Sequence, residues 1–544
     1  MITFDDVTYT YPESSSAALR DVSLQIGAGE FVLLVGGSGA GKSTLLRAMN
    51  GLVPHFYGGV WRGHVLLDGV DTLTRQPHEL AGQVGFVFQD PEAQAVAEEV
   101  ENELAFGMEN LGLDPLLMRR RVEEVLHQLD LDHLRKRRIS TLSGGERQRL
   151  AIAAALTMQP RALLLDEPTS QLDPQSAEEL LTLLQKLNAD LGITVVISEH
   201  RLERVVQYAD RILYMADGAI AADDLPRAAL AAIPFTPPVA TLGKALGWAP
   251  LPLSVREARR FAAAGPLPAS PTVGGVSATP SLISGGGQGG GAGDPLLELR
   301  NLSFAYAGVE VLRNVNLVVQ RGEVLAVMGR NGAGKTTLLK LIVGLLQPSG
   351  GTVRLASERV SGRPVSELAR CIGYVPQNAR VTLFADTVSD ELRFTLRGHH
   401  LPVDEQRVND TLAALGIAQH AARYPRDLSI GEQQRVGIAA LLVANPDVVL
   451  LDEPTRGLDY ANKAALVAYL DTLKRQGRAV VLVTHDVELV AEVADRVALL
   501  ANGEVAVSGP TRTVLGGSLI FSTQVGKLYG NGMLTAKDVM RSEE

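Results

Sequence analysis

The chain of 544 residues is poor in several features that would otherwise widen the choice of function. It holds one cysteine, Cys371, which excludes an internal disulfide and any site built from several cysteines. Aromatic residues make up only 5%, so aliphatic side chains must fill the interior, as strands buried between helices require. The sequence has no uninterrupted apolar run of about 18 residues, and its first residues lack a basic region followed by an apolar one. We therefore expect a cytosolic setting, with any membrane role carried by partner chains.

Charge and length exclude further classes. The formal net charge of −10 opposes broad, unspecific binding to nucleic acid, so no nucleic-acid partner is expected. The chain is also too long for one ordinary hydrophobic core. These properties predict a protein of at least two domains.

The same motifs occur twice in the same order, about 285 to 295 positions apart. Each copy begins with a match to G-x-x-x-x-G-K-[ST], which is the pattern of a phosphate-binding loop. The first loop consists of Gly36, Gly37, Ser38, Gly39, Ala40, Gly41, Lys42 and Ser43. The second consists of Gly329, Arg330, Asn331, Gly332, Ala333, Gly334, Lys335 and Thr336.

Each loop follows an apolar run, 31–35 or 324–328, and precedes a helix-like segment that starts near Leu45 or Leu338. This context predicts a strand, a phosphate loop and a helix. Glycines let backbone N–H groups surround phosphate oxygens, the lysine neutralises charge, and the hydroxyl of Ser43 or Thr336 can bind Mg²⁺. The alternative, a glycine-rich turn without nucleotide, does not explain why spacing, lysine and hydroxyl all agree.

A pair of acids ends a later apolar strand in each copy, Asp166 with Glu167 and Asp452 with Glu453. Because successive strand side chains point in opposite directions, the first acid can meet the Mg²⁺ shell while the second faces the γ-phosphate. The second acid can then orient or deprotonate the attacking water. The alternative is that the acids merely end a strand.

Two further segments open alanine-rich helices, and a helix N-terminus with small residues is an anion site. They contain Ser143, Gly144, Gly145 and Glu146 in the first copy, and Ser429, Ile430, Gly431 and Glu432 in the second. Here the sequence resembles the ATP-binding-cassette ATPases, whose signature is L-S-G-G-[QE]. The resemblance implies an α/β fold with two P-loop nucleotide-binding domains, each carrying a helical signature subdomain, and ATP and Mg²⁺ as ligands.

The resemblance also implies further site residues. Gln89 and Gln377 match the family's Q-loop, where they join the metal shell and the catalytic set. The D-loop acids are matched by Asp173 and Asp459, the switch histidines by His200 and His485, and the adenine-stacking aromatics by Tyr11 and Tyr306. Alone, such residues are more often surface, core or packing positions, and only their register with the other motifs favours these roles.

In that family two cassettes pair head to tail, so one chain can supply both ATPase halves. Site one would combine the first copy's Lys42, Ser43, Gln89, Asp166, Glu167 and His200 with Ser429, Gly431 and Glu432. Site two would combine Lys335, Thr336, Gln377, Asp452, Glu453 and His485 with Ser143, Gly145 and Glu146. Ile430 replaces a signature glycine beside site one, which predicts slower turnover there.

Each copy continues into a tail that also repeats. Residues 235–242 align with 521–528, and Ser254 with Glu257 parallels Thr535 with Asp538 as a capping-box-like helix start. The alternative is coincidence between short surface helices. We predict a first ATPase domain with its tail over 1–261, a Gly/Pro/Ser-rich linker over 262–295, and a second ATPase domain with its tail over 296–544.

A closer resemblance is to ATPases of energy-coupling-factor importers, carried by 50–59, 87–94 and 103–112 in the first copy and 383–392 in the second. It implies a peripheral protein on the cytoplasmic face of the membrane, with a transmembrane scaffold subunit and a substrate-binding membrane subunit as partners. Segment 54–59 looks most like thiamine or hydroxymethylpyrimidine importers, by analogy alone. The acidic residues after the Q-loop would suit basic residues on docking helices of the membrane subunit; the alternative is a solvated acidic face. In the same segment, Ala95 stands where relatives usually have a bulky apolar residue. A soluble factor acting on ribosomes or nucleic acid and a sugar-type importer stay open.

Overall fold

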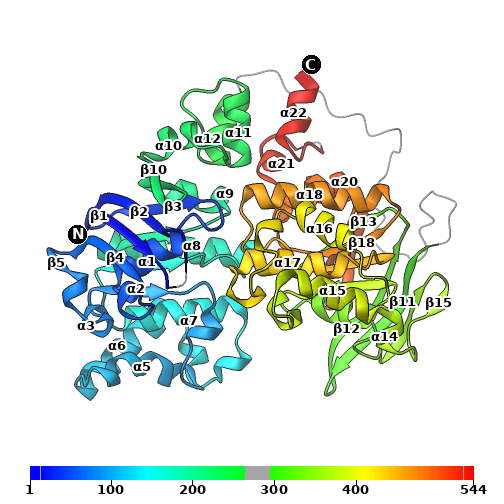
Figure 1. The fold of residues 1–544 in the computed structure, drawn as a ribbon, viewed down its shortest axis with the longest axis horizontal. Helices are drawn as coiled ribbons and strands as arrows, with labels where there is room; N and C mark the ends of the chain where they lie inside the picture. Colours follow the sequence, from blue (N-terminus) through cyan, green and yellow to red (C-terminus); the bar gives the residue numbers. More distant parts are fainter. Residues whose placement is uncertain (13, 264–294, 531, 544) are drawn as a thin grey trace. The chain divides into compact units, whose positions relative to one another are not determined.

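A computed structural model describes residues 1–12, 14–263, 295–530 and 532–543. The described chain forms two compact units, Met1–Glu257 with Gly457–Tyr460, and Ala258–Arg456 with Ala461–Glu544 (Figure 1). The predicted linker over 262–295 lies outside the described residues except for 262, 263 and 295. The domain limits at 261 and 296 stay a prediction.

Each unit contains a six-stranded sheet that is parallel apart from one edge strand. The first has the order β10 (Ala219–Asp224), β9 (Arg211–Ala216), β3 (Phe31–Gly36), β8 (Thr194–Ser198), β7 (Ala162–Asp166) and β6 (Val84–Val87). The second has the order β20 (Glu504–Pro510), β19 (Arg496–Ala501), β13 (Val324–Met328), β18 (Ala479–Val483), β17 (Val448–Asp452) and β16 (Ile372–Val375). The strand order is the same in both copies, so both place the same strand ends together.

A four-stranded antiparallel sheet accompanies each of these sheets. The first is β2 (Leu19–Ile26), β1 (Ile2–Thr10), β4 (Val60–Leu67) and β5 (Val70–Asp71), and the second is β12 (Val309–Val319), β11 (Leu297–Tyr306), β14 (Gly350–Leu355) and β15 (Glu358–Arg359). The inner strands β3, β7 and β8 are buried along their whole length, which explains why apolar runs make up most of each strand.

Helices cover these sheets and form a separate subdomain in each unit. The covering helices of the first unit are α1 (Lys42–Met49), α2 (Leu52–His55), α3 (Pro77–Leu80), α8 (Pro174–Leu191) and α9 (Leu202–Val205); in the second unit they are α13 (Lys335–Ile342), α14 (Val365–Leu368), α18 (Tyr460–Arg475) and α19 (Val487–Val493). The subdomains contain α4 (Pro91–Gln94), α5 (Val100–Asn110), α6 (Pro115–Gln128) and α7 (Gly144–Leu156), and α15 (Val388–Gly398), α16 (Glu405–Ala414) and α17 (Ile430–Leu442). Among the described residues, none of the helices combines the length and apolarity needed to span a membrane.

Both predicted tails form helices, and buried residues of each tail pack onto its own unit. They contain α10 (Pro226–Ala232), α11 (Pro238–Ala245) and α12 (Val255–Ala262) in the first copy, and α20 (Thr511–Gly516), α21 (Gln524–Tyr529) and α22 (Ala536–Glu543) in the second. In the first tail Leu230 and Ala240 join the main hydrophobic core, and in the second Leu515 and Leu534 pack with β19 and α19. The similarity between the tails is therefore structural.

Both predicted helix starts have the expected bond from the acid's N–H to the hydroxyl, and the box at Thr535 is complete because Asp538 Oδ2 also accepts the Thr535 N–H at 2.9 Å. At the first start, Glu257 Oε2 accepts the Leu253 N–H at 2.9 Å instead of that of Ser254. The Ser254 hydroxyl accepts the Glu257 N–H at 3.3 Å, and the Thr535 hydroxyl accepts the Asp538 N–H at 3.2 Å. Each acid also pairs with an arginine from the first helix of its tail, Arg227 with Glu257 at 2.9 Å and Arg512 with Asp538 at 2.6 Å. The matched ion pairs hold the last helix of each tail against the first.

Replacing Arg512 by alanine should loosen α22. The Asp538 carboxylate is mostly buried. Burial alone would raise its pKa, but Arg512 and the backbone N–H groups outweigh this effect and bring the pKa below its ordinary value. Removing the arginine leaves that charge without its main partner, at a cost on the order of 1–2 kcal/mol. Hydrogen exchange of the α22 amides should become several-fold faster. The matched control is Arg541→Ala in the same helix, and equal protection in the two variants would contradict the role of the pair.

Candidate functional site

The phosphate loops connect β3 to α1 and β13 to α13, as the sequence predicts, although each helix starts at its lysine rather than near Leu45 or Leu338. The residue before the lysine has a left-handed backbone in both copies, with φ of 99° at Gly41 and 98° at Gly334. A Cβ on Gly41 would also lie 2.5 Å from the Ala18 carbonyl oxygen. Only glycine fits there, because both the backbone angle and the close approach exclude a side chain.

Both loop lysines are buried and bound to the loop itself. Lys42 Nζ donates to the carbonyl oxygens of Gly36 and Gly37, both at 2.9 Å. Lys335 Nζ donates in the same way to Gly329 at 2.8 Å and Arg330 at 2.9 Å. Burial lowers the pKa of Lys42, and the nearby Glu167 and Asp166 carboxylates oppose that effect. The ammonium is thus held at the start of a helix whose first N–H groups favour anions.

The first acid of each pair is the last residue of its strand. Asp166 Oδ1 accepts from the Ser198 hydroxyl at 2.7 Å and also bonds Ser43 of the phosphate loop. Asp452 Oδ2 accepts from the Thr336 hydroxyl at 2.7 Å. The predicted metal donors, a loop hydroxyl and a carboxylate, are therefore adjacent in both copies, and an oxygen-only set of this kind fits Mg²⁺. Burial raises the pKa of Asp166 and of Asp452.

The second acid lies beyond the strand in a left-handed turn, with φ of 48° at Glu167 and 51° at Glu453. The separation of the two carboxylates therefore does not come from strand alternation, as the sequence argument supposed. It comes from a backbone conformation that costs a non-glycine residue about 1–3 kcal/mol. Such strain, repeated at the same position in both copies, directs the second carboxylate to a different place from the first.

Glu167 is brought together with two other predicted residues. His200 Nε2 lies 2.9 Å from its Oε1, and Gln89 Nε2 donates to its Oε2 at 2.6 Å. Burial would raise the pKa of Glu167, but His200 and then Lys42 and Gln89 lower it below its ordinary value. The carboxylate is thus ionised at neutral pH and acts as a hydrogen-bond acceptor.

The second copy arranges the same residue types differently. His485 Nε2 lies 3.3 Å from Glu453 Oε1 and 2.9 Å from Asn331 Oδ1 of the phosphate loop. The hydroxyl of Thr484 also donates to Glu453, at 3.3 Å. Within the described part of the chain, no bond from Gln377 to Glu453 corresponds to the one from Gln89. The two acids therefore share a histidine neighbour, while Gln89 contacts the first acid and Thr484 contacts the second.

Glu199 immediately precedes His200, at the position that Thr484 occupies before His485, and the sequence analysis assigned it no role. Its side chain is fully enclosed, and Oε1 accepts the Thr169 N–H at 2.9 Å. Burial raises the pKa of Glu199, with the Thr169 bonds opposing this. The signal in the sequence is that an acid precedes the histidine in the first copy and a threonine precedes it in the second.

Both signature segments are capping boxes. The Ser143 hydroxyl accepts the Glu146 N–H at 3.3 Å while Glu146 Oε2 accepts the Ser143 N–H at 2.6 Å, and Ser429 with Glu432 does the same at 3.4 and 2.8 Å. Gly144 and Gly145 follow Ser143, and partly exposed Ile430 takes the first helical position of α17. Glu432 is also paired with His420 at 2.9 Å.

The remaining predicted residues lie at loop ends. Asp173 caps α8 by accepting the Ser176 N–H at 2.9 Å, and Asp459 Oδ2 accepts the Ser38 N–H at 2.6 Å within the first unit. Tyr11 follows β1, with its hydroxyl 3.2 Å from Thr44 Oγ1 of α1. Tyr306 ends β11 and is 45% exposed. Gly39, Ala40, Gly332 and Ala333 complete the two loops.

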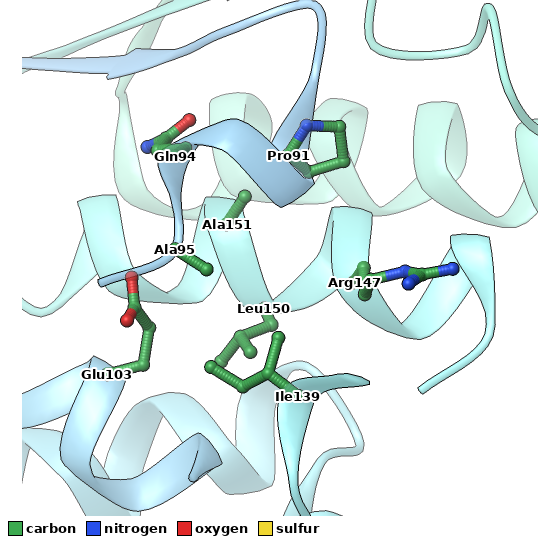
Figure 2. A pocket seen from close by; sticks show the side chains of 8 residues that line it. All are labelled: Pro91, Gln94, Ala95, Glu103, Ile139, Arg147, Leu150 and Ala151. Atoms are coloured by element: carbon green, nitrogen blue, oxygen red, sulfur yellow. The ribbon is translucent and has the colours of Figure 1, made fainter. Parts of the chain in front are cut away.

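A pocket lies between the segment after the Q-loop and the signature helix (Figure 2). Its lining includes Pro91, Gln94, Ala95, Glu103, Ile139, Arg147, Leu150 and Ala151. Glu103 Oε2 accepts the N–H groups of Val96 at 2.9 Å and Ala97 at 2.8 Å. Glu391 makes the same two bonds, both at 2.8 Å, in the second copy. Sequence reasoning missed these glutamates, although the matching Glu-Leu-x-Phe segments in the two copies could have indicated them.

Replacing Glu199 by glutamine should change how stability depends on pH. Its pKa is raised in the folded state, so the folded protein keeps a proton that the unfolded chain releases. The stability that Glu199 contributes is full below its unfolded pKa and is lost as pH rises through the folded pKa. Glutamine keeps the acceptor and does not ionise. The difference in apparent melting temperature between Glu199→Gln and the natural chain should grow as pH rises from about 4.5. Exposed Glu179→Gln is the control, and a difference independent of pH would refute the assignment.

The sequence was then compared with known proteins. The family described as ABC transporter matches residues 19–170 and 312–456, which include both phosphate loops and both acid pairs. An ABC transporter ATP-binding protein, by its assigned name, from Streptomyces avermitilis is 47% identical over 97% of this chain and 97% of its own length. Another so named, from Methanosarcina mazei, is 38% identical over 94% of this chain and 90% of its own.

Among solved structures, cbiO1 from Clostridium perfringens, described as part of the ABC transporter complex cbiONQ, is 29% identical. The match covers 48% of this chain and 98% of that one, with a TM-score of 0.40. The family match covers both copies and the first relative is similar over nearly its whole length. The chain therefore belongs to the ABC transporter family, as one of its ATP-binding proteins that hydrolyse ATP to ADP and phosphate.

Proposed function

We propose that this chain is the ATPase subunit of an energy-coupling-factor-type importer for a small solute, a vitamin, a vitamin precursor or a metal ion. It would lie peripherally on the cytoplasmic face of the membrane, beside a transmembrane scaffold subunit and a substrate-binding membrane subunit. The observation that carries this proposal is the pocket beside Ala95, in the segment that follows Gln89. The pocket is lined by apolar side chains together with Glu103 and Arg147, and it lies next to the signature helix, where a partner could make contact.

The residues of the two sites fit the roles that the family resemblance implies. Lys42 and Lys335 would exchange their loop carbonyl partners for phosphate oxygens, which also repay the cost of burying an ammonium. Ser43, Asp166 and Gln89, or Thr336, Asp452 and Gln377, would hold Mg²⁺, which when bound neutralises phosphate charge. Tyr11 and Tyr306 would carry the adenine.

Hydrolysis needs an acceptor for a proton of the attacking water. Glu167 fits that role because it is ionised, and because His200 and Gln89 fix both of its oxygens. Glu453 is held instead by His485 and Thr484. Both copies therefore keep a positioned carboxylate and a histidine, which supports hydrolysis at both sites. The signature serines and D-loop acids would complete each site in a head-to-tail pair.

Disabling one site at a time should expose unequal turnover. Site one would face Ile430, whose β-branched side chain crowds the γ-phosphate while its backbone N–H stays a donor at the first helical position. Each glutamate-to-glutamine change should slow its own site by about 10²-fold or more. We expect more residual ATPase in Glu167→Gln than in Glu453→Gln, measured by phosphate release, with the double variant as the baseline. Equal residual rates would count against slower turnover at site one.

Charging the surface beside the pocket should uncouple the chain from its membrane partner. Val96→Asp places a carboxylate on an exposed position next to Ala95, outside the phosphate loops and the acid pairs, so basal ATPase should stay unchanged. Co-purification of a small hydrophobic membrane subunit with the tagged chain should fall several-fold. The control is Ala221→Asp, at an exposed position of β10. Unchanged recovery of the membrane subunit would remove the pocket from the interface, and recovery of ribosomes in its place would favour a soluble ATP-driven factor.

A further inference from the structure

An aromatic cluster surrounds Tyr11 in the first copy and has no equivalent among the described residues of the second. It consists of Tyr9, Tyr11, Phe56, Tyr57 and Trp61. Tyr11 makes edge contacts with Tyr9 at 4.8 Å and with Tyr57 at 5.9 Å between ring centroids. Edge-to-face pairs of this kind are attractive beyond the area they bury.

Tyr11 is also tied to the helix that carries the phosphate-loop lysine. Its hydroxyl lies 3.2 Å from Thr44 Oγ1 and accepts from Arg47 Nη1 at 3.1 Å. Both partners belong to α1, which begins at Lys42. The ring is therefore fixed relative to the phosphate loop at its hydroxyl end, and relative to two other rings along its edges.

Arg47 links the two outer parts of the cluster. Its guanidinium lies over the Tyr57 ring, 5.0 Å from the centroid, while the same group donates to the Tyr11 hydroxyl. A cation over an aromatic face is attractive, and more so when partly removed from water. Tyr57 thus holds Arg47 in place, and Arg47 holds Tyr11.

The second copy lacks this support. Tyr306 is 45% exposed, and Phe304, at 4.7 Å, is the aromatic ring beside it. The position of Arg47 is taken by Lys340, five residues after the loop lysine in each case. Two pairs of glycines occupy equivalent positions in the two copies. Gly51 and Gly344 have a left-handed backbone and lie close to a leucine side chain, and Gly63 and Gly351 lie close to backbone carbonyls of β1 and β11.

Between those glycines the first copy spans 12 positions (63 − 51) and the second spans 7 (351 − 344), so the first has five more. The longer segment contains Phe56 and Tyr57. Segment 54–59, which resembles thiamine or hydroxymethylpyrimidine importers, therefore also has a local structural effect. It places Tyr57 against Tyr11, the ring expected to stack on the base in one of the two sites.

We infer that Tyr57 is a positioning residue for the purine base of ATP in site one, acting through Arg47 and Tyr11. This inference rests on the proposed role of Tyr11. A ring that is already fixed loses less conformational freedom on binding than an exposed one, by about 0.5–1.5 kcal/mol per side chain. Site one consequently binds ATP about two- to tenfold more tightly than site two.

The test uses the full chain with one site disabled at a time. Lys335→Ala leaves site one to bind a non-hydrolysable ATP analogue, and Lys42→Ala leaves site two, with affinity measured by equilibrium dialysis. Adding Tyr57→Ala should weaken binding about two- to tenfold in the Lys335→Ala chain and leave the Lys42→Ala chain unchanged. Tyr57→Phe keeps the ring and should restore the affinity of site one.

A local signal accompanies the dialysis. Trp61 and Trp248 are the two tryptophans of the chain, so Trp248→Phe leaves Trp61, whose ring lies 5.7 Å from Tyr9, to report on the cluster. The fluorescence of Trp61 should change only when the ATP analogue binds at site one. The midpoint of this titration should lie at a higher analogue concentration in Tyr57→Ala. Unchanged affinity in Tyr57→Ala, or equal weakening of both sites, would overturn the inference while leaving ATP binding intact. If Tyr11→Ala binds the analogue as tightly as the natural chain, the proposed role of Tyr11 fails instead.

Discussion

The structure of each site depends on a left-handed residue at the end of a buried parallel strand. Asp166 continues β7, while the next residue reverses the backbone and sends its carboxylate elsewhere. The surrounding sheet must supply the energy of that conformation, since an isolated chain would relax it. Four neighbours make this possible: the Ser198 hydroxyl accepts the Glu167 N–H at 3.1 Å, and His200, Gln89 and Lys42 stabilise the carboxylate. The fold is thus organised to hold one charge in a place that the strand alone would not give it.

Much of the fold and the site could be predicted from the sequence because the motifs carry their own geometry. A glycine before the loop lysine requires a left-handed turn, and an apolar run of β3 type requires burial on both faces. The capping boxes at Ser143, Ser429 and Thr535 are local, so their residue spacing determines their hydrogen bonds. Interactions between distant segments were less accessible. No spacing rule brings Glu199 to Thr169 or Arg47 to Tyr57, and those contacts come from packing.

The duplicated chain keeps the same scaffold and changes what surrounds each reactive group. Both copies have the strand order and the strained glutamate, but the residue before the histidine is Glu199 in one and Thr484 in the other. The aromatic residue proposed to stack on the base contacts other rings in the first copy and is exposed in the second. The signature of the second copy is further restrained by His420. These differences lie beside the reactive residues, so equal sets of motifs do not make equal sites.

The hydrogen bonds of Glu103 and Glu391 have a separate consequence. Each carboxylate accepts only backbone N–H groups of the loop after the Q-loop, from Val96 and Ala97 or from Phe384 and Ala385. The shape of that loop is therefore independent of the side chains it displays. Exposed Val96 and exposed Phe384 occupy matching positions, one small and one aromatic. The two copies thus present different side chains at the same position of the same loop backbone.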